Sequence, residues 1–85
     1  MAYRLELSPR ASRDLKKIPV RARERLKDHI DALAQAPRPI GVVKLAGEIN
    51  AYRIRVSDYR VLYEIHDQVL VVIVLKVADR KEAYR

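Results

Sequence analysis

The stretch Tyr52–Ile65, which reads YRIRVSDYRVLYEI, decides the expected fold. It alternates apolar with basic or polar residues on both sides of the dipeptide Ser57-Asp58, which favours a tight turn. Alternation with a period of two is typical of strands with two different faces. The stretch therefore predicts a β-hairpin with one apolar face and one face that carries guanidinium groups, among them Arg53 and Arg55. Such a face suits an anionic partner.

The residues before this hairpin predict one strand and two helices. Alternation over Tyr3–Leu7 predicts the strand. Ser8 is a good N-cap and Pro9 a good first helical residue, so we expect a helix over about residues 8–18. A second helix is expected over about residues 20–36, because apolar residues recur there at helical spacing: Ala22, Leu26, Ile30, Leu33 and Ala34.

The residues after the hairpin predict a last strand. Asp67-Gln68 predicts a second tight turn, and Val69–Val77 is almost continuously apolar, as expected for a strand covered on both faces. The expected fold class is α+β, with an N-terminal strand and a helical hairpin packed on one face of a small, largely antiparallel four-stranded sheet. Residues 1–85 are expected to form one domain, and the other face of the sheet is left open for function.

The composition restricts the kinds of partner and binding site that this protein can have. The net charge of +7 over 85 residues indicates nucleic acid, an acidic protein, or both as partners. There is no cysteine, which excludes a disulfide scaffold and a cysteine-ligated metal. Met1–Leu7 is too charged for a signal peptide, and the longest apolar run is too short to span a membrane. We therefore expect a soluble, cytoplasmic protein with no membrane partner.

Arginine and tyrosine are the residues left to carry the chemistry. The only glycines are Gly41 and Gly47, the two histidines His29 and His66 are far apart, and the acidic residues are scattered. No metal or cofactor site is therefore expected. Cations interleaved with aromatic rings suit single-stranded RNA. Two plainer interpretations stay open: core filling for the tyrosines, and protection of a strand edge for the arginines.

With these residues in view, the sequence resembles the RelE toxin family, within the RelE/ParE superfamily of bacterial and archaeal toxin–antitoxin systems. The segments that carry the resemblance are Lys44-Leu45, Tyr52–Arg55, Asp58–Tyr63 and Val77–Arg85. The resemblance covers nearly the whole chain, including the helical hairpin. It implies a RelE-like fold, a RelB-like antitoxin as partner, and contact with operator DNA only as part of the toxin–antitoxin complex.

The resemblance also implies an activity and a set of site residues. RelE-like toxins are ribosome-dependent endoribonucleases that cut mRNA in the ribosomal A site without a metal or cofactor. The implied catalytic residues are Arg53 and Arg55 beside the reacting 2′-hydroxyl, Arg60 on the scissile phosphate, Arg80 near the leaving oxygen and Tyr84 stacked on a base. The implied RNA-binding residues are Lys44, Tyr59, Lys81 and Arg85.

One departure from the family affects the mechanism. Positions 53 and 55, often lysine in the best-known members, are both arginine here. Arginine stays protonated in proteins and does not readily accept a proton. Electrostatic stabilisation, or a proton acceptor from the ribosome, water or RNA, would then be needed. Two other functions stay open: a ParE-like inhibitor of DNA gyrase, and a weakly active relative that acts as a binding module with its antitoxin.

Overall fold

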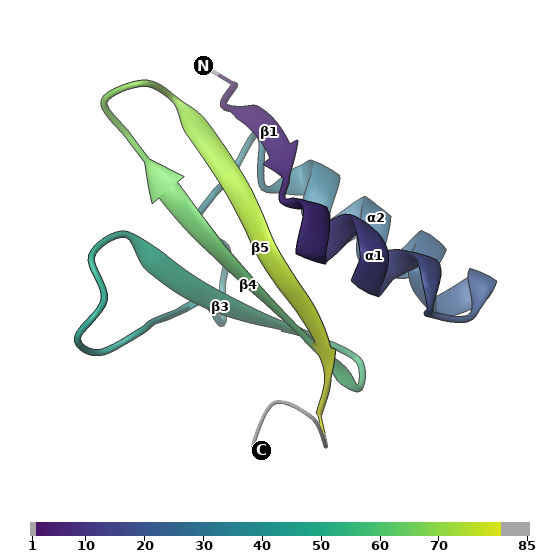
Figure 1. The fold of residues 1–85 in the computed structure, drawn as a ribbon. Coiled ribbons are helices and arrows are strands. Elements are labelled where there is room, and N and C mark those ends of the chain that lie inside the picture. The colour runs from purple at the N-terminus through teal and green to yellow at the C-terminus, as the bar shows by residue number, and fades with distance from the viewer. Residues whose placement is uncertain (1, 81–85) are drawn as a thin grey trace.

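The computed structural model describes residues 2–80 of the chain. Its elements are, in order, β1 (Arg4–Leu7), α1 (Pro9–Lys16), α2 (Val20–Ala32), β2 (Val43–Lys44), β3 (Ala51–Val56), β4 (Tyr59–His66) and β5 (Val71–Asp79). Both helices lie on the same side of the sheet (Figure 1), so the expected α+β class with a helical hairpin on one face is confirmed. Neither of the two helices is long and apolar enough to span a membrane.

The sheet differs from the expected one in strand number and direction. It has five strands in the order β1-β5-β4-β3-β2. β1 pairs with β5 in parallel, and the other neighbours are antiparallel. The expectation of a largely antiparallel four-stranded sheet is corrected by the short β2, whose two residues are too few to show a period. The parallel pair is possible because most of the chain lies between β1 and β5, which gives the length that a parallel connection needs.

Several element ends also differ from expectation. Both helices end early, at Lys16 and Ala32, and the next N–H groups bond to carbonyls three residues back, Lys17 to Asp14 and Leu33 to Ile30. The second turn spans residues 67–70 instead of two residues, and Leu70 in it has a φ of 54°. β5 consequently starts at Val71 and continues to Asp79. The predicted N-cap of α1 is confirmed, since Ser8 Oγ accepts the N–H of Ala11 at 3.0 Å.

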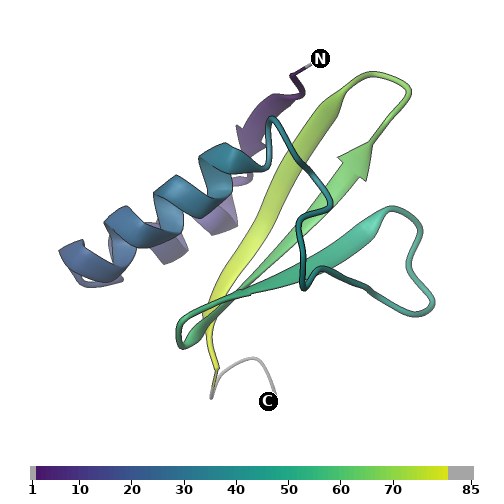
Figure 2. The same cartoon turned by 180° about the vertical axis from the view of Figure 1, so that it is seen from behind.

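The core lies between the helices and the facing side of the sheet, and Figure 2 shows these two layers from behind. Two of the tyrosines fill it. Tyr63 is fully buried and donates its hydroxyl to the carbonyl of Pro37 at 2.7 Å, and burial raises the pKa of Tyr63 to about 12. Its ring stacks on Tyr52 with 6.0 Å between centroids. The core-filling interpretation is thus confirmed for these two tyrosines, while Tyr59 is half-buried against the same core.

A polar network ties the start of the chain to the turn between β4 and β5. Arg38 donates two hydrogen bonds to the Asp67 carboxylate, at 3.1 and 2.8 Å, and Tyr3 donates its hydroxyl to the same carboxylate at 2.6 Å. The Arg38 guanidinium also lies 5.2 Å from the centre of the Tyr52 ring. These donors hold the pKa of Asp67 down at about 2, with the Arg38 hydrogen bonds as the largest cause.

We predict that Asp67→Asn makes stability less dependent on pH in acid. Because the folded pKa of about 2 lies below the ordinary 3.8, the ionised carboxylate favours the folded state. Its contribution is fully present above pH 3.8 and is lost as the pH falls through about 2. Urea unfolding at several pH values should show a gap between wild type and variant at pH 7 that closes in acid. Asp31→Asn, on the exposed surface of α2, is the control, and a gap that persists at pH 2 would contradict the prediction.

The edge of β5 beyond the end of β1 is completed by two side chains, those of the α1 N-cap Ser8 and of Asp14 in the second turn of α1. Ser8 donates its hydroxyl to the carbonyl of Leu75 at 2.8 Å. Asp14 Oδ2 accepts the N–H of Val77 at 3.0 Å. These two side chains continue the hydrogen bonding that β1 stops making at Leu7, and they fix α1 against β5.

Asp14→Ala should lower the free energy of unfolding by about 1–3 kcal/mol, the usual cost of leaving a partly buried N–H without its acceptor. Asp14→Asn keeps an acceptor oxygen of the same shape and should cost less. Chemical denaturation of both variants measures the difference. Equal losses for alanine and asparagine would show that the hydrogen bond to Val77 contributes little.

Candidate functional site

Among the described residues, four arginines have register positions on the sheet face opposite the helices; we call it the arginine face. Arg4 lies at its far edge on β1, and Arg53, Arg55 and Arg60 lie together on β3 and β4. On β3, Ile54 and Val56 are buried toward the helices. Arg53 and Arg55 alternate with them along the strand and therefore lie on the opposite face. Arg55 lies directly opposite Arg60 of β4. The two strands of the hairpin therefore bring Arg55 and Arg60 to neighbouring positions on one face, with Arg53 two residues along β3.

The turn at Ser57-Asp58 sets this convergence. Ser57 has a φ of 54°, as the first residue of a two-residue hairpin turn often does. Arg25 of α2 donates to Ser57 Oγ at 2.9 Å and holds the turn against the helix layer. With only two residues in the turn, the pairing of Arg55 with Arg60 is fixed, because a shift of one residue would move both side chains to other faces.

The end of β5 meets the same turn. The N–H of Arg80 donates to the carbonyl of Asp58 at 2.7 Å, which brings Arg80 to the end of the sheet that carries Arg55 and Arg60. Ala78 lies directly opposite Arg60 on the arginine face. Arg60 itself is only 7% exposed although it is charged. A guanidinium this well covered is held in place by its surroundings more firmly than an ordinary surface arginine.

Two of the predicted RNA-binding residues, Lys44 and Tyr59, do not share this face. Lys44 lies opposite Tyr52, and Tyr59 lies opposite Val56, so their register positions are on the helix side of the sheet. The structure thus brings together Arg53, Arg55 and Arg60, with Arg80 at the same end, and places Lys44 and Tyr59 apart from them. Lys81, Tyr84 and Arg85 lie outside the described residues, and their roles remain predictions.

Lys76, which interrupts the apolar stretch Val69–Val77, also lies on the arginine face. A β-bulge in β5 skips Leu75, so the register passes from Tyr63–Val74 to Leu62–Lys76. Lys76 therefore lies opposite Leu62 and faces away from the helices. A charged residue within an otherwise apolar stretch indicates that Lys76 has a special position. The face on which Lys76 lies depends on the bulge, however, and alternation of residue types does not predict a bulge.

Farther along β4, the arginine face carries a carboxylate and an imidazole. His66 Nε2 lies 3.0 Å from Glu64 Oε1, and both side chains are about one-third exposed. His66 is the last residue of β4. His29 is exposed on α2, with Nδ1 2.9 Å from the carbonyl oxygen of Arg25. Within residues 2–80, no three His, Cys, Asp or Glu side chains are grouped to hold a metal ion.

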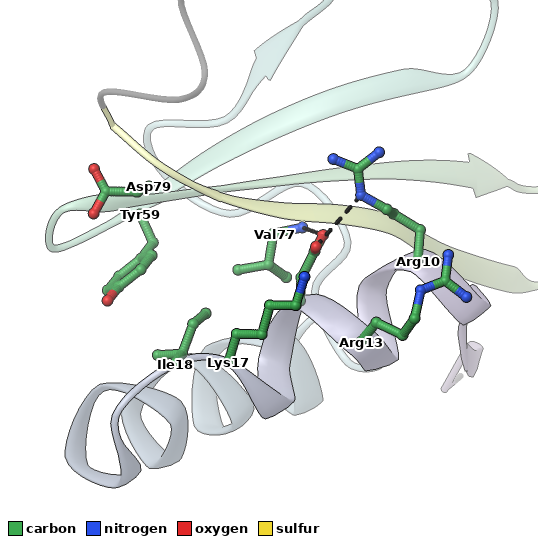
Figure 3. A pocket seen from close by; sticks show the side chains of 8 residues that line it. Arg10, Arg13, Lys17, Ile18, Tyr59, Val77 and Asp79 are labelled. Carbon is green, nitrogen blue, oxygen red and sulfur yellow. Dashed lines mark hydrogen bonds and ion pairs between the residues drawn. The ribbon is translucent and has the colours of Figure 1, made fainter.

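A hollow with a volume of about 550 Å³ lies on the helix side of the sheet, between α1, the start of β4 and the end of β5 (Figure 3). Its lining residues are Arg10, Arg13, Asp14, Lys17, Ile18, Tyr59, Val77 and Asp79. A smaller hollow of about 220 Å³ lies between α2 and the Ser57 turn. Neither includes a residue of the arginine face, so the hollows and the converging arginines are separate features. The arginines have the chemistry that a phosphate group needs.

The chain matches a family model described as "ParE toxin of type II toxin-antitoxin system, parDE" over residues 5–84. It is 34% identical to the mRNA interferase toxin RelE of Escherichia coli K12 over 85 residues, which are 98% of this chain and 88% of that protein. The chain therefore belongs to the RelE family of toxins, within the group that this family model describes.

Solved structures agree with this assignment. The toxin–antitoxin complex RelBE2 of Mycobacterium tuberculosis matches with a TM-score of 0.83 and 28% identity, over 94% of this chain and all of that chain. The archaeal RelE–RelB complex of Pyrococcus horikoshii OT3 matches with a TM-score of 0.83 and 30% identity, over 94% of this chain and 97% of that chain. The RelE-like fold that the sequence predicted is thus confirmed, with the corrections to the sheet given above.

Ser57→Val should destabilise the hairpin that carries the arginines. A β-branched residue at positive φ is disfavoured relative to glycine by about 1–2 kcal/mol. Ser57→Gly is the matched control, because it also removes the hydroxyl that Arg25 contacts but tolerates this backbone conformation. Thermal unfolding should rank Ser57→Val below Ser57→Gly. The opposite ranking would show that the turn does not require a positive φ.

Proposed function

We propose that this chain is the toxin component of a toxin–antitoxin system and acts in the cytoplasm as a ribosome-dependent endoribonuclease that cleaves mRNA without a metal. Relatives that are named mRNA interferases support the reaction class. The observation that carries the proposal for this chain is the direct pairing of Arg55 with Arg60 on the arginine face, with Arg53 two residues along β3. Several guanidinium groups at one point match a phosphate group better than a diffuse basic surface does.

RNA supplies its own nucleophile in this reaction. The 2′-oxygen attacks the adjacent phosphorus, and the bond to the 5′-oxygen of the next nucleotide breaks, which leaves a 2′,3′-cyclic phosphate. In the proposed site Arg60 holds the scissile phosphate, while Arg53 and Arg55 lie beside the 2′-hydroxyl. The fixed positions of these groups on two paired strands favour alignment and stabilise the extra negative charge of the transition state.

The end of the chain is assigned the remaining catalytic roles. Arg80, which the hydrogen bond to Asp58 keeps near the Ser57 turn, is proposed to act near the leaving oxygen. Tyr84 is proposed to stack on a base, and Lys81 and Arg85 to bind the RNA backbone. Lys44 and Tyr59 are on the helix side of the sheet, so any RNA that they contact lies away from the scissile phosphate.

A RelB-like antitoxin is the proposed protein partner. Solved structures of relatives contain RelE together with RelB. The net charge of +7 favours an antitoxin segment that is acidic, since complementary charge speeds and orients association. Contact with operator DNA is proposed only for the toxin–antitoxin complex.

A ParE-like inhibitor of DNA gyrase is the second candidate. It is favoured by the family model, whose description names a ParE toxin. This function would need no catalysis, and the paired arginines would then be part of a binding surface only. The two candidates differ in their target, and one set of assays separates them.

Cleavage of a defined mRNA on stalled ribosomes, mapped at its 3′ ends, tests the proposal. Wild type should cut in the A site. Arg60→Ala should reduce the cleavage rate by about 10²–10³-fold, the usual effect of removing one donor that stabilises a transition-state oxyanion. Arg60→Lys keeps the charge but not the planar fork and should lose part of the activity. Circular dichroism shows whether each variant folds, which matters because Arg60 is buried.

Arg21→Ala is the control, because Arg21 is exposed on α2. Its cleavage rate should equal that of wild type. No cutting by folded wild type, together with a block of gyrase supercoiling, would overturn the proposal in favour of the ParE-like function.

A further inference from the structure

We propose that Lys76 accepts the proton of the attacking 2′-hydroxyl, an inference that rests on the RNA cleavage proposed above. The reaction needs a proton acceptor, and Arg53, Arg55 and Arg60 do not provide one because guanidinium stays protonated in proteins. Among the side chains that the structure brings to the arginine face, Lys76 carries an amine, and a neutral amine accepts a proton.

The register puts Lys76 beside the arginines. Lys76, Leu62 and Arg53 form one row across β5, β4 and β3, and Ala78, Arg60 and Arg55 form the next row. Lys76 and Arg60 are therefore diagonal neighbours on adjacent strands, at a typical Cα separation of about 7–8 Å. Between Lys76 and Arg53 lies only Leu62, an apolar side chain that does not compete for the proton.

The bulge in β5 is what creates this arrangement. The buried positions that face the helices are Val72, Val74 and then Val77, a step of three where regular alternation gives two. In a regular strand Lys76 would follow Val74 into the core, and Val77 would face out. Bulges commonly re-aim a side chain beside an active site, and this one turns the lysine from the core to the arginine face.

Three other groups among the described residues on this face can accept a proton, and all are less well placed. Glu6 lies on β1, in the row of Ile73 and Glu64 and two strands away from Arg60. Glu64 is four residues from Arg60 along β4, about 13 Å at the rise of a β-strand, and His66 is farther still. These two are also in contact with each other. A base must come within hydrogen-bond reach of the hydroxyl that it deprotonates, so proximity to the phosphate-binding arginine favours Lys76.

The charged groups around Lys76 come from β3 and β4. Arg60 and Glu64 flank it on β4, and Arg53 lies beyond Leu62 on β3. β1 ends at Leu7, opposite Val74, and so provides no neighbour at this row. α1 packs at the other face, where Ser8 and Asp14 contact the backbone on either side of Lys76. The lysine side chain is partly buried, which limits the number of positions it can adopt.

The proposed step balances as follows. The proton of the 2′-hydroxyl passes to Nζ of Lys76 while the 2′-oxygen forms a bond to phosphorus. The bond between phosphorus and the 5′-oxygen breaks with its electron pair on that oxygen, which takes up a proton from water. The products are a 2′,3′-cyclic phosphate, a 5′-hydroxyl end and a protonated Lys76, and loss of its proton to solvent restores the enzyme.

Single-turnover cleavage of ribosome-bound mRNA with wild type, Lys76→Ala and Lys76→Arg tests the role. Both variants should lose about 10²–10⁴-fold in rate, the usual contribution of a general base. Added ethylamine should restore part of the rate to Lys76→Ala, because it fits the space that the side chain leaves, and should not restore Lys76→Arg. Toxin binding to ribosomes, measured separately, should stay near the wild-type level.

Lys27→Ala on the exposed surface of α2 is the control and should cut like wild type. Full activity in Lys76→Arg would show that a positive charge suffices and would overturn the proposal, as would Lys76→Ala that cuts normally or folded Lys76→Ala that ethylamine does not rescue. If wild type itself does not cut, the proposed endoribonuclease function fails and this inference fails with it.

Discussion

The register between β3, β4 and β5 is the constraint on which the rest of the structure depends. Two local irregularities set it: the positive φ of Ser57 in a two-residue turn, and the bulge at Leu75. The turn places Arg55 opposite Arg60, and the bulge places Lys76 on the same face as both. A slip of one residue in either strand would move these side chains to the core and the valines to solvent, so the burial of the apolar face and the assembly of the arginine face are one and the same constraint.

Charge repulsion is the cost of this assembly. Like charges directly opposite one another on a sheet are destabilising, and Arg55 with Arg60 is such a pair. The packing on the other face offsets this, since fully buried residues of α2, β4 and β5 form a continuous core under the arginines. An arrangement that breaks a local rule and is held by strong packing elsewhere is expected at a functional site.

The sequence predicts most of the fold and part of the site, for reasons that differ between elements. Alternation and the Ser57-Asp58 turn locate the hairpin well, and Ser8-Pro9 locates the start of α1, because each depends on nearby residues only. The parallel pairing of β1, the two-residue β2 and the face of Lys76 depend on contacts between distant segments or on one irregular residue. Lys44 is an example of what a motif does not predict. Its sequence motif matches the family, but its register position opposite Tyr52 is on the helix side of the sheet.

The arrangement divides the chemistry between two kinds of cation on different strands. The planar, permanently charged arginines of β3 and β4 suit phosphate oxygens, which need fixed donors. A proton acceptor must exchange its proton, and within residues 2–80 the amine that the register brings to this face is that of Lys76 on β5. Because the proposed proton acceptor, Lys76, lies on β5, catalysis does not require a lysine at position 53 or 55 of β3. The bulge that turns Lys76 outward also returns Val77 to the core, so the β5 irregularity that serves the chemistry is stabilised by burial instead of being opposed by it.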